Sequence, residues 1–154
     1  MYGRSLGVPV VLADVLKGFF PALLATQLID ARAGVLAGAA AMLGHWRPLF
    51  LGFAKGGKMV ATCGGAFFGL APLVAIAALG VWVVVFVALR YASLASMTAA
   101  VSLPVIAALL GEPWEVIAFA AAAAVAVVVL HRANIKRLRA GTESRFALRR
   151  ARAA

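Results

Sequence analysis

The chain has 154 residues, of which 65% are hydrophobic and only 13% are charged, and this balance excludes an ordinary soluble domain. Polarity does not alternate along the apolar stretches, which argues against a membrane barrel. The net charge of +10 does not indicate a nucleic-acid partner, because eight of the fifteen cations lie between Arg132 and Arg152. Such a basic block after a last apolar segment is typical of an anchor to anionic lipid, so we expect a lipid bilayer and no nucleic acid as partner.

Apolar segments follow one another along the chain and predict membrane helices, because backbone polar groups in lipid must be satisfied within each segment. Residues 59–89 carry no charge and would form a single helix about 46 Å long, which exceeds a hydrocarbon core of roughly 30 Å. We therefore predict two shorter helices hinged near Pro72. The fold class is an all-α polytopic membrane protein with about six transmembrane or partly spanning helices. We expect these at 8–29, 33–46, 60–71, 73–89, 93–110 and 114–131.

The distribution of charge supports the hinge. With it, Lys55, Lys58, Arg90 and the basic tail fall on one side of the membrane, whereas the other side receives Arg32 and three carboxylates. Cytoplasmic loops are enriched in Lys and Arg, so we expect that first side and the C-terminus to be cytoplasmic. We predict a membrane domain at 1–140 and a basic cytoplasmic tail at 141–154.

A cationic, glycine-rich loop separates the second and third apolar segments. It contains Lys55-Gly56-Gly57-Lys58, and paired glycines before a helix start can present backbone N–H groups to an anion. The spacing approaches the nucleotide-binding pattern G-x-x-x-x-G-K-[ST], but Met59 stands where the hydroxyl residue belongs, which excludes ATP and GTP. We predict a phosphate site at the membrane surface. The alternative is a helix-breaking loop whose lysines only set the topology.

Other polar residues lie near the ends of the apolar segments. His131 and Asn134 are three apart, so on a continuing helix they share one face that can hold phosphate oxygens and hydroxyls. A basic interfacial helix end is the simpler interpretation of that pair. Arg90 with Ser93 is a second candidate phosphate site, or a topogenic arginine only. His45 is either a helix-end cap or a ligand of the glycine loop.

Asp14 and Lys17 are three apart within the first apolar segment. An isolated charge at mid-bilayer costs about 2.5–3.5 kcal/mol, so we expect these two residues to face the bundle and to pair. The Cys, His and acidic residues do not have the spacing of a metal site or of a covalent nucleophile, so we expect no metal and no cofactor.

These motifs resemble those of the PlsY-type acyl-phosphate:glycerol-3-phosphate acyltransferases, which are bacterial integral membrane enzymes. Asp14-Val15-Leu16-Lys17-Gly18 is similar to the family's D-x-x-K-G. The stretch from Gly44 to Thr62 is similar to its second motif, G-H-x-x-P-x-F…F-K-G-G-K-G-V-A-T, with Ala54 inserted and Met59 in place of a glycine. Residues 90–96 and 131–143 match later signatures in the right order.

The family's first motif, G-S-x-N-x-G-A-T-N, and the helix before it are not found in these 154 residues. Arg4-Ser5-Leu6-Gly7 is similar to the residues that follow that motif. The resemblance therefore implies six helices here and seven in a full member. We expect a longer reading frame to add an apolar helix and a Gly-Ser-x-Asn loop, and we expect the shorter chain to transfer little acyl group alone.

The resemblance implies transfer of a fatty acyl group from acyl-phosphate to glycerol 3-phosphate. The product, 1-acylglycerol 3-phosphate (lysophosphatidic acid), is a precursor in phospholipid biosynthesis at the bacterial cytoplasmic membrane, and the acyl chain would lie between helices. A small transporter or channel for phosphorylated anions and an inactive truncated scaffold are the alternatives. The resemblance implies a catalytic role for Lys58, phosphate binding by Lys58, Gly56 and Gly57, and glycerol 3-phosphate binding by Arg4, His131 and Asn134. His45, Lys55, Arg90 and Ser93 are further candidate substrate-binding residues from their positions in the sequence.

Overall fold

The structure is a computed structural model that describes residues 4–48, 52–54 and 56–146, with side chains from residue 7 onward. Within these ranges the regular elements are all α-helices, which confirms the predicted fold class. Each of the six predicted apolar segments forms a helix, and a short seventh helix follows the last of them. The helices are α1 (Arg4–Leu28), α2 (Ala31–Trp46), α3 (Val60–Leu70), α4 (Pro72–Leu89), α5 (Ala92–Leu109), α6 (Trp114–Leu130) and α7 (Arg132–Arg139).

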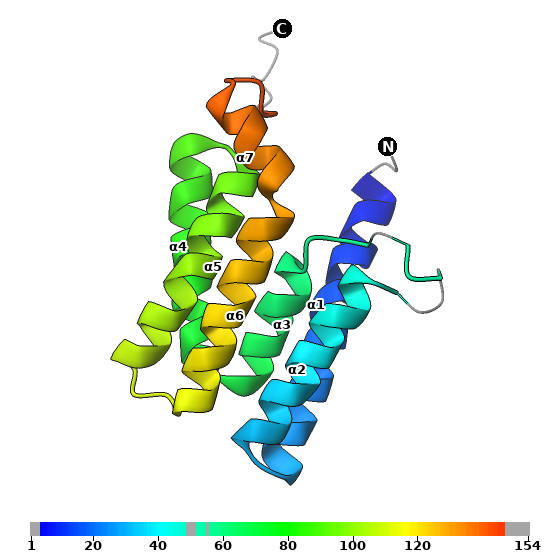
Figure 1. Cartoon of the computed structure of the whole chain (residues 1–154), viewed down its shortest axis with the longest axis vertical. Coiled ribbons are helices and arrows are strands. Elements are labelled where there is room, and N and C mark those ends of the chain that lie inside the picture. Colours follow the sequence, from blue (N-terminus) through cyan, green and yellow to red (C-terminus); the bar gives the residue numbers. More distant parts are fainter. Residues whose placement is uncertain (1–3, 49–51, 55, 147–154) are drawn as a thin grey trace, which may run out of the picture.

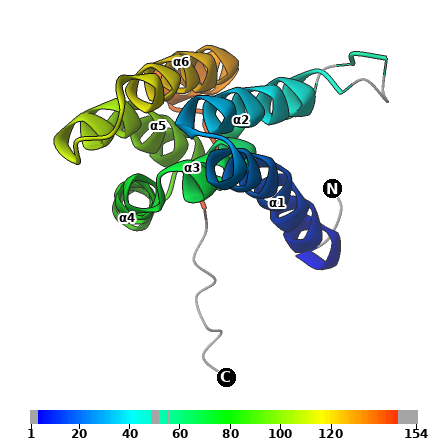
Figure 2. The same ribbon diagram turned by 90° about the horizontal axis from the view of Figure 1, so that it is seen from below.

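The helices form a bundle with α3 at its centre (Figures 1 and 2). The pair α1 and α2 packs on one side of α3, and α4, α5 and α6 follow one another on the other side. The start of α1, the loop from α2 to α3, the turn from α4 to α5 and helix α7 all lie at the same end of the bundle (Figure 1). The chain thus brings its predicted polar loops to one end, as the charge distribution required.

Helix length separates full spans from partial ones. In the described part of the chain, residues Gly7–Leu28 of α1 and all of α4 and α5 are long and apolar enough to cross a membrane. The pair α6 and α7 would be a fourth span if counted together, although it bends by 58°. Helix α3 has only 11 residues and is therefore about 16 Å long.

The break between α3 and α4 confirms the predicted hinge. Helix α3 ends at Leu70, and Ala71 leaves the helical conformation with φ −145° and ψ 78°. Pro72 is then the first residue of α4, where its missing N–H costs nothing because that group has no partner within the helix. The uncharged stretch is thus divided into two helices at Ala71 and Pro72.

Helices α1 and α3 approach closely because glycines line their contact. A Cβ atom on Gly18 would collide with the Thr62 carbonyl oxygen, and one on Gly65 with the Val15 carbonyl oxygen. Small residues at such positions let membrane helices pack backbone to backbone. On the other side of α3, the rings of Phe67 and Phe119 stack with centroids 5.2 Å apart and so join α3 to α6.

The opposite end of the bundle carries short turns. Asp30 is the N-cap of α2, and its Oδ1 accepts a hydrogen bond of 2.8 Å from the Ala33 N–H. The helix therefore begins two residues earlier than hydropathy alone predicted. Nearby, Arg32 Nε lies 2.7 Å from Glu115 Oε1, which links α2 to α6 at this end.

Candidate functional site

Lys58 and Asn134, which are far apart in sequence, meet at the polar end of the bundle. Lys58 Nζ donates a hydrogen bond of 2.7 Å to Asn134 Oδ1. Lys58 comes from the loop before α3, whereas Asn134 is on α7 and is only 5% exposed. The contact places the predicted catalytic lysine beside a predicted substrate-binding amide.

Glu143 connects this pair to two further segments. Its Oε1 accepts hydrogen bonds of 2.6 Å from both Asn134 Nδ2 and Ser93 Oγ, and its Oε2 lies 2.7 Å from Arg137 Nε. Burial by itself would raise the pKa of Glu143, but the hydrogen bonds from Ser93, Asn134 and Arg137 and the positive charge of Arg137 lower that pKa to about 2. The carboxylate therefore stays charged at neutral pH and fixes the Asn134 amide.

Sequence reasoning did not assign a role to Glu143. The available signal was its position as an acidic residue within a strongly basic C-terminal region. The segment that carries it folds back on the bundle, since the Phe146 N–H donates a hydrogen bond of 2.8 Å to the Arg90 carbonyl oxygen. The Arg90 carbonyl oxygen is thus the acceptor that holds the folded-back segment. Arg90 is also the C-cap of α4, with a left-handed φ of 62°.

His131 lies at the bend between α6 and α7. The predicted end of the last apolar segment at residue 131 agrees with the structure, in which the chain bends by 58° between α6 and α7, so His131 and Asn134 do not lie on one continuous helix. The His131 N–H is shared between the carbonyls of Val127 and Val128, and the ring Nδ1 lies 2.7 Å from the Val127 oxygen. The backbone N–H and the ring of His131 thus both contact the Val127 carbonyl oxygen at the C-terminal end of α6. His131 is nevertheless buried, as is Asn134, so both predicted residues face inward.

A second cluster joins α1 to the end of α2. Lys17 Nζ lies 2.6 Å from Asp14 Oδ1 and 2.6 Å from His45 Nδ1, and His45 Nδ1 lies 3.3 Å from the same Asp14 oxygen. The expected pairing of Asp14 and Lys17 is confirmed. His45 belongs to this cluster, a contact that the sequence did not predict.

The two glycines of the loop pack directly on His45. A Cβ atom on Gly56 would collide with the His45 carbonyl oxygen, and one on Gly57 with the ring Nε2. The Gly56 N–H donates a hydrogen bond of 2.9 Å to the Trp46 carbonyl. The prediction that this amide is presented to a phosphate is therefore corrected, because the amide already holds the loop against the end of α2.

Met59 follows Lys58 in a left-handed conformation, with φ +66°. Glycine adopts this conformation without steric cost, so the structure explains why the family motif has a glycine here. The Met59 side chain is only 3% exposed and is part of the core. Among the other predicted residues, Lys55 and the side chain of Arg4 lie outside the described part of the chain.

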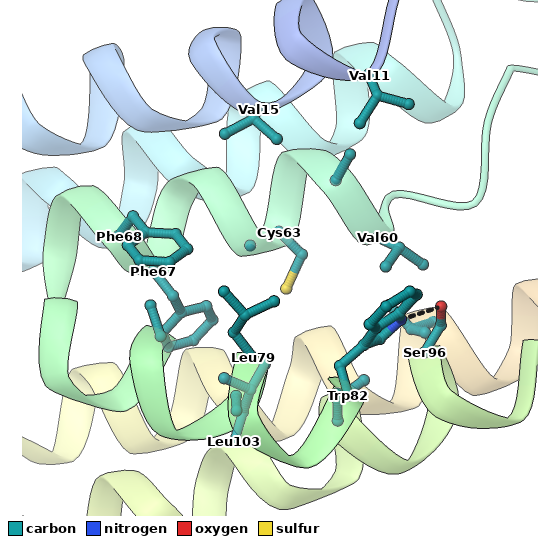
Figure 3. Close-up of a pocket in the computed structure, with 17 residues that line it drawn as sticks. Val11, Val15, Val60, Cys63, Phe67, Phe68, Leu79, Trp82, Ser96 and Leu103 are labelled. Atoms are coloured by element: carbon teal, nitrogen blue, oxygen red, sulfur yellow. Dashed lines mark hydrogen bonds between the residues drawn. The ribbon is translucent and has the colours of Figure 1, made fainter. Parts of the chain in front are cut away.

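An apolar cavity of about 380 Å³ begins beside the polar cluster and lies among α1, α3, α4 and α5 (Figure 3). Val60 is at its polar end, two residues after Lys58, and there Trp82 Nε1 donates a hydrogen bond of 3.1 Å to Ser96 Oγ. Ser96 is one helical turn from Ser93, so cavity and network share α5. The lining residues include Val11, Val15, Cys63, Phe67, Phe68, Leu79 and Leu103.

The charged network of Lys58, Asn134 and Glu143 therefore lies next to an apolar cavity, an arrangement that suits a molecule with a charged headgroup and an apolar tail. The family model described as "Glycerol-3-phosphate acyltransferase" matches residues 1–141. The chain belongs to the glycerol-3-phosphate acyltransferase family. It is 45% identical over 145 residues to the glycerol-3-phosphate acyltransferase of Geotalea daltonii, covering 94% of this chain and 74% of that protein. The relative from Geobacter sulfurreducens is 44% identical over the same shares.

Solved structures of the family have the same fold as this chain. The crystal structure of PlsY (YgiH), an integral membrane glycerol 3-phosphate acyltransferase, in its glycerol 3-phosphate form matches with a TM-score of 0.90 and 41% identity. The match covers 94% of this chain and 73% of that one. A second PlsY structure, in the lysophosphatidic acid form, matches with a TM-score of 0.89. The architecture is therefore that of a multi-pass membrane acyltransferase.

Proposed function

We propose that this chain transfers a fatty acyl group from acyl-phosphate to glycerol 3-phosphate and yields 1-acylglycerol 3-phosphate. The observation that carries the proposal is the Lys58–Asn134–Glu143 network beside an apolar cavity, in a chain of the glycerol-3-phosphate acyltransferase family. The glycerol 3-phosphate and lysophosphatidic acid forms of PlsY correspond to the acceptor and the product of this reaction. They support the same chemistry here.

Lys58 has the central role in this proposal. Both substrates carry phosphate, so their approach requires positive charge close to the reacting atoms. The Lys58 ammonium has three N–H donors, and Asn134 accepts from one of them. Because Glu143 fixes the Asn134 amide, Asn134 in turn orients Lys58 toward the phosphate that it binds.

The reaction itself needs little from the protein beyond binding and orientation. A glycerol hydroxyl oxygen attacks the acyl carbonyl carbon and forms the new ester bond. The bond from that carbon to the phosphate oxygen breaks, and the leaving phosphate accepts the hydroxyl proton. Phosphate is a good leaving group, so neither a covalent enzyme intermediate nor a further reactant is required.

The apolar cavity would hold the acyl chain. Its volume of about 380 Å³ lies within the range of roughly 300–1,000 Å³ found for ligand pockets. The Trp82–Ser96 hydrogen bond marks its polar end, near Val60 and thus near Lys58. An acyl chain that entered between α1 and α4 would therefore bring its carbonyl carbon to the polar network.

We also propose that the polar end faces the cytoplasm of a bacterial inner membrane. Lys58, Arg90 and the cations of α7 lie at that end, whereas Arg32 is at the other, with Asp30 and Glu115. This distribution agrees with the enrichment of Lys and Arg in cytoplasmic loops. Protease added to intact spheroplasts should leave a C-terminal tag uncut, whereas protease added after the spheroplasts are lysed should digest it. Digestion in intact spheroplasts would contradict the orientation.

The donor is tested with the purified chain in detergent. We expect glycerol 3-phosphate to be acylated by palmitoyl-phosphate, at the low rate expected above for these 154 residues, and not by palmitoyl-CoA, measured as radiolabelled 1-acylglycerol 3-phosphate. The rate should persist in EDTA. Transfer from palmitoyl-CoA alone, or loss of the rate in EDTA, would contradict the proposal. A folded chain that is inactive with both donors would support the alternative of an inactive scaffold.

A further inference from the structure

The two histidines of the chain have opposite kinds of partner at the same ring atom. His45 Nδ1 lies 2.6 Å from the Lys17 ammonium, whereas His131 Nδ1 lies 2.7 Å from the Val127 carbonyl oxygen. An ammonium group can only donate a hydrogen bond, and a carbonyl oxygen can only accept one. His45 Nδ1 must therefore be an acceptor and His131 Nδ1 a donor. The neutral rings carry their protons on different nitrogens.

The arrangement at His45 differs from the common pairing of a histidine with a carboxylate. Its nearer partner is Lys17 Nζ at 2.6 Å, whereas Asp14 Oδ1 is 3.3 Å away. Asp14 instead contacts Lys17 at 2.6 Å and so holds the ammonium in place. The three residues form a chain of interactions in which the carboxylate acts on the lysine and the lysine acts on the imidazole.

The far side of the His45 ring supports the glycine loop. A Cβ atom on Gly57 would collide with Nε2, so the loop backbone rests directly on that atom. One residue earlier, Gly56 is tied to the Trp46 carbonyl by a hydrogen bond of 2.9 Å. Lys58 follows immediately, so the orientation of the His45 ring determines where the Lys58 backbone lies.

We propose that Asp14 and Lys17 are positioning residues that hold His45 with its proton on Nε2 and thereby place the loop that carries Lys58. The effect on catalysis rests on the acyl transfer proposed above, whereas the tautomer of His45 does not. Lys17 thus stabilises the contact between α1 and the end of α2 without touching a substrate.

The tautomers are measured by NMR on the full chain labelled with ¹⁵N-histidine in detergent micelles, with His131→Gln used to assign the two rings. We expect the Nε2–H pattern for His45 and the Nδ1–H pattern for His131. In Lys17→Met the His45 signals should show a mixture of tautomers, while the His131 signals stay unchanged. In Lys17→Arg, which keeps a cationic donor, His45 should keep the Nε2–H pattern of the parent chain. Two rings with the same tautomer, or an unchanged His45 in Lys17→Met, would overturn the proposal.

Kinetics provide the second measurement. Lys17→Met should lower kcat/KM for glycerol 3-phosphate by roughly tenfold or more, and Lys17→Arg should recover most of it. Arg32→Met removes a cation from the opposite end and should change neither rate nor NMR pattern. If the parent chain is active and Lys17→Met has the same kcat/KM, only the positioning role proposed here is contradicted. If the parent chain shows no acyl transfer at all, the proposed function is contradicted, and the NMR measurement of the tautomers decides the present inference. If Lys17→Met fails to insert, Asp14→Asn gives the same comparison.

Discussion

The two ends of the helix bundle each contain a short arginine–glutamate contact, but in different surroundings. Arg137 Nε and Glu143 Oε2 are 2.7 Å apart at the polar end, and Arg32 Nε and Glu115 Oε1 are 2.7 Å apart at the other. The Arg137 and Glu143 side chains are 47% and 7% exposed, and the Arg32 and Glu115 side chains are 71% and 13% exposed. The main difference is that Glu143 also accepts hydrogen bonds from Ser93 and Asn134. The two contacts have the same length, but the Arg137–Glu143 contact is part of a hydrogen-bond network, whereas the Arg32–Glu115 contact is an ion pair with an exposed arginine.

The two ends differ in how many segments of the chain meet there, not in the length of their arginine–glutamate contacts. Glu143 accepts from α5 through Ser93 and from α7 through Asn134, and Asn134 then contacts Lys58 on the loop before α3. Each partner comes from a different part of the chain. At the opposite end, the ion pair joins α2 to α6 and needs no further partner to explain it.

The largest expected effect is at Lys58. Lys58→Ala removes the charge that offsets phosphate, so the rate of acyl transfer should fall by roughly 10²–10³-fold. The protein should still insert, because Lys58 is exposed and is not part of the helix packing. Initial rates are compared at equal amounts of membrane-inserted protein. Near-normal turnover by purified Lys58→Ala would remove the central role of this residue and the functional distinction between the two ends.

Glu143→Gln should have the next largest effect. Glutamine retains an oxygen for Ser93 and Asn134 but places an N–H group against Arg137, so the rate should fall by roughly tenfold. Glu115→Gln is the matched control at the other end and should leave the rate unchanged. Equal losses in both variants would contradict the comparison of the two ends.

Glu143 also predicts a dependence of stability on pH. Because its pKa is lowered from 4.5 to about 2, its contribution is complete above pH 4.5 and is lost as the pH falls from there toward 2. The parent chain should therefore lose thermal stability across that interval, measured in detergent. Glu143→Gln should lose less over the same interval, and parallel curves for the two proteins would assign the loss to other carboxylates.

Met59 tests the loop next to Lys58 through stability. Met59→Gly relieves the left-handed backbone, worth about 1 kcal/mol, but deletes a buried side chain, a loss of about 2 kcal/mol or more. We expect a net decrease in stability of about 1 kcal/mol by thermal unfolding. Met59→Ala loses the side chain without relieving the backbone, so it should be the least stable of the three. A Met59→Gly chain more stable than its parent would show that backbone strain exceeds the value of the side chain.

The smallest effect is expected at the opposite end. Arg32→Met removes one partner of an exposed ion pair, which contributes little in water and is screened by salt. Acyl transfer should be unchanged, and the unfolding temperature should move only slightly. A clear loss of activity in Arg32→Met would mean that this end communicates with the site.

Local rules were sufficient for the elements of the fold and for the residue types of the site. Hydropathy predicted the six apolar segments, and bilayer thickness together with Pro72 predicted the break between α3 and α4. The distribution of cations predicted that the glycine loop and the turn at Arg90 share one end. These predictions succeeded because helix formation in lipid depends on short stretches of sequence and on a solvent of fixed thickness.

Only the tertiary structure decided which polar groups meet. Lys58 and Asn134 are 76 residues apart, and no local pattern announces their contact. It also assigned the Gly56 amide to Trp46 instead of an anion, bent the chain at His131, and made Glu143 the centre of the network. Such contacts depend on how glycines let α1 approach α3 and on where the folded-back segment after α7 lies. Hydrogen bonds between distant segments form only once packing has brought both partners together, and that packing is a property of the whole bundle.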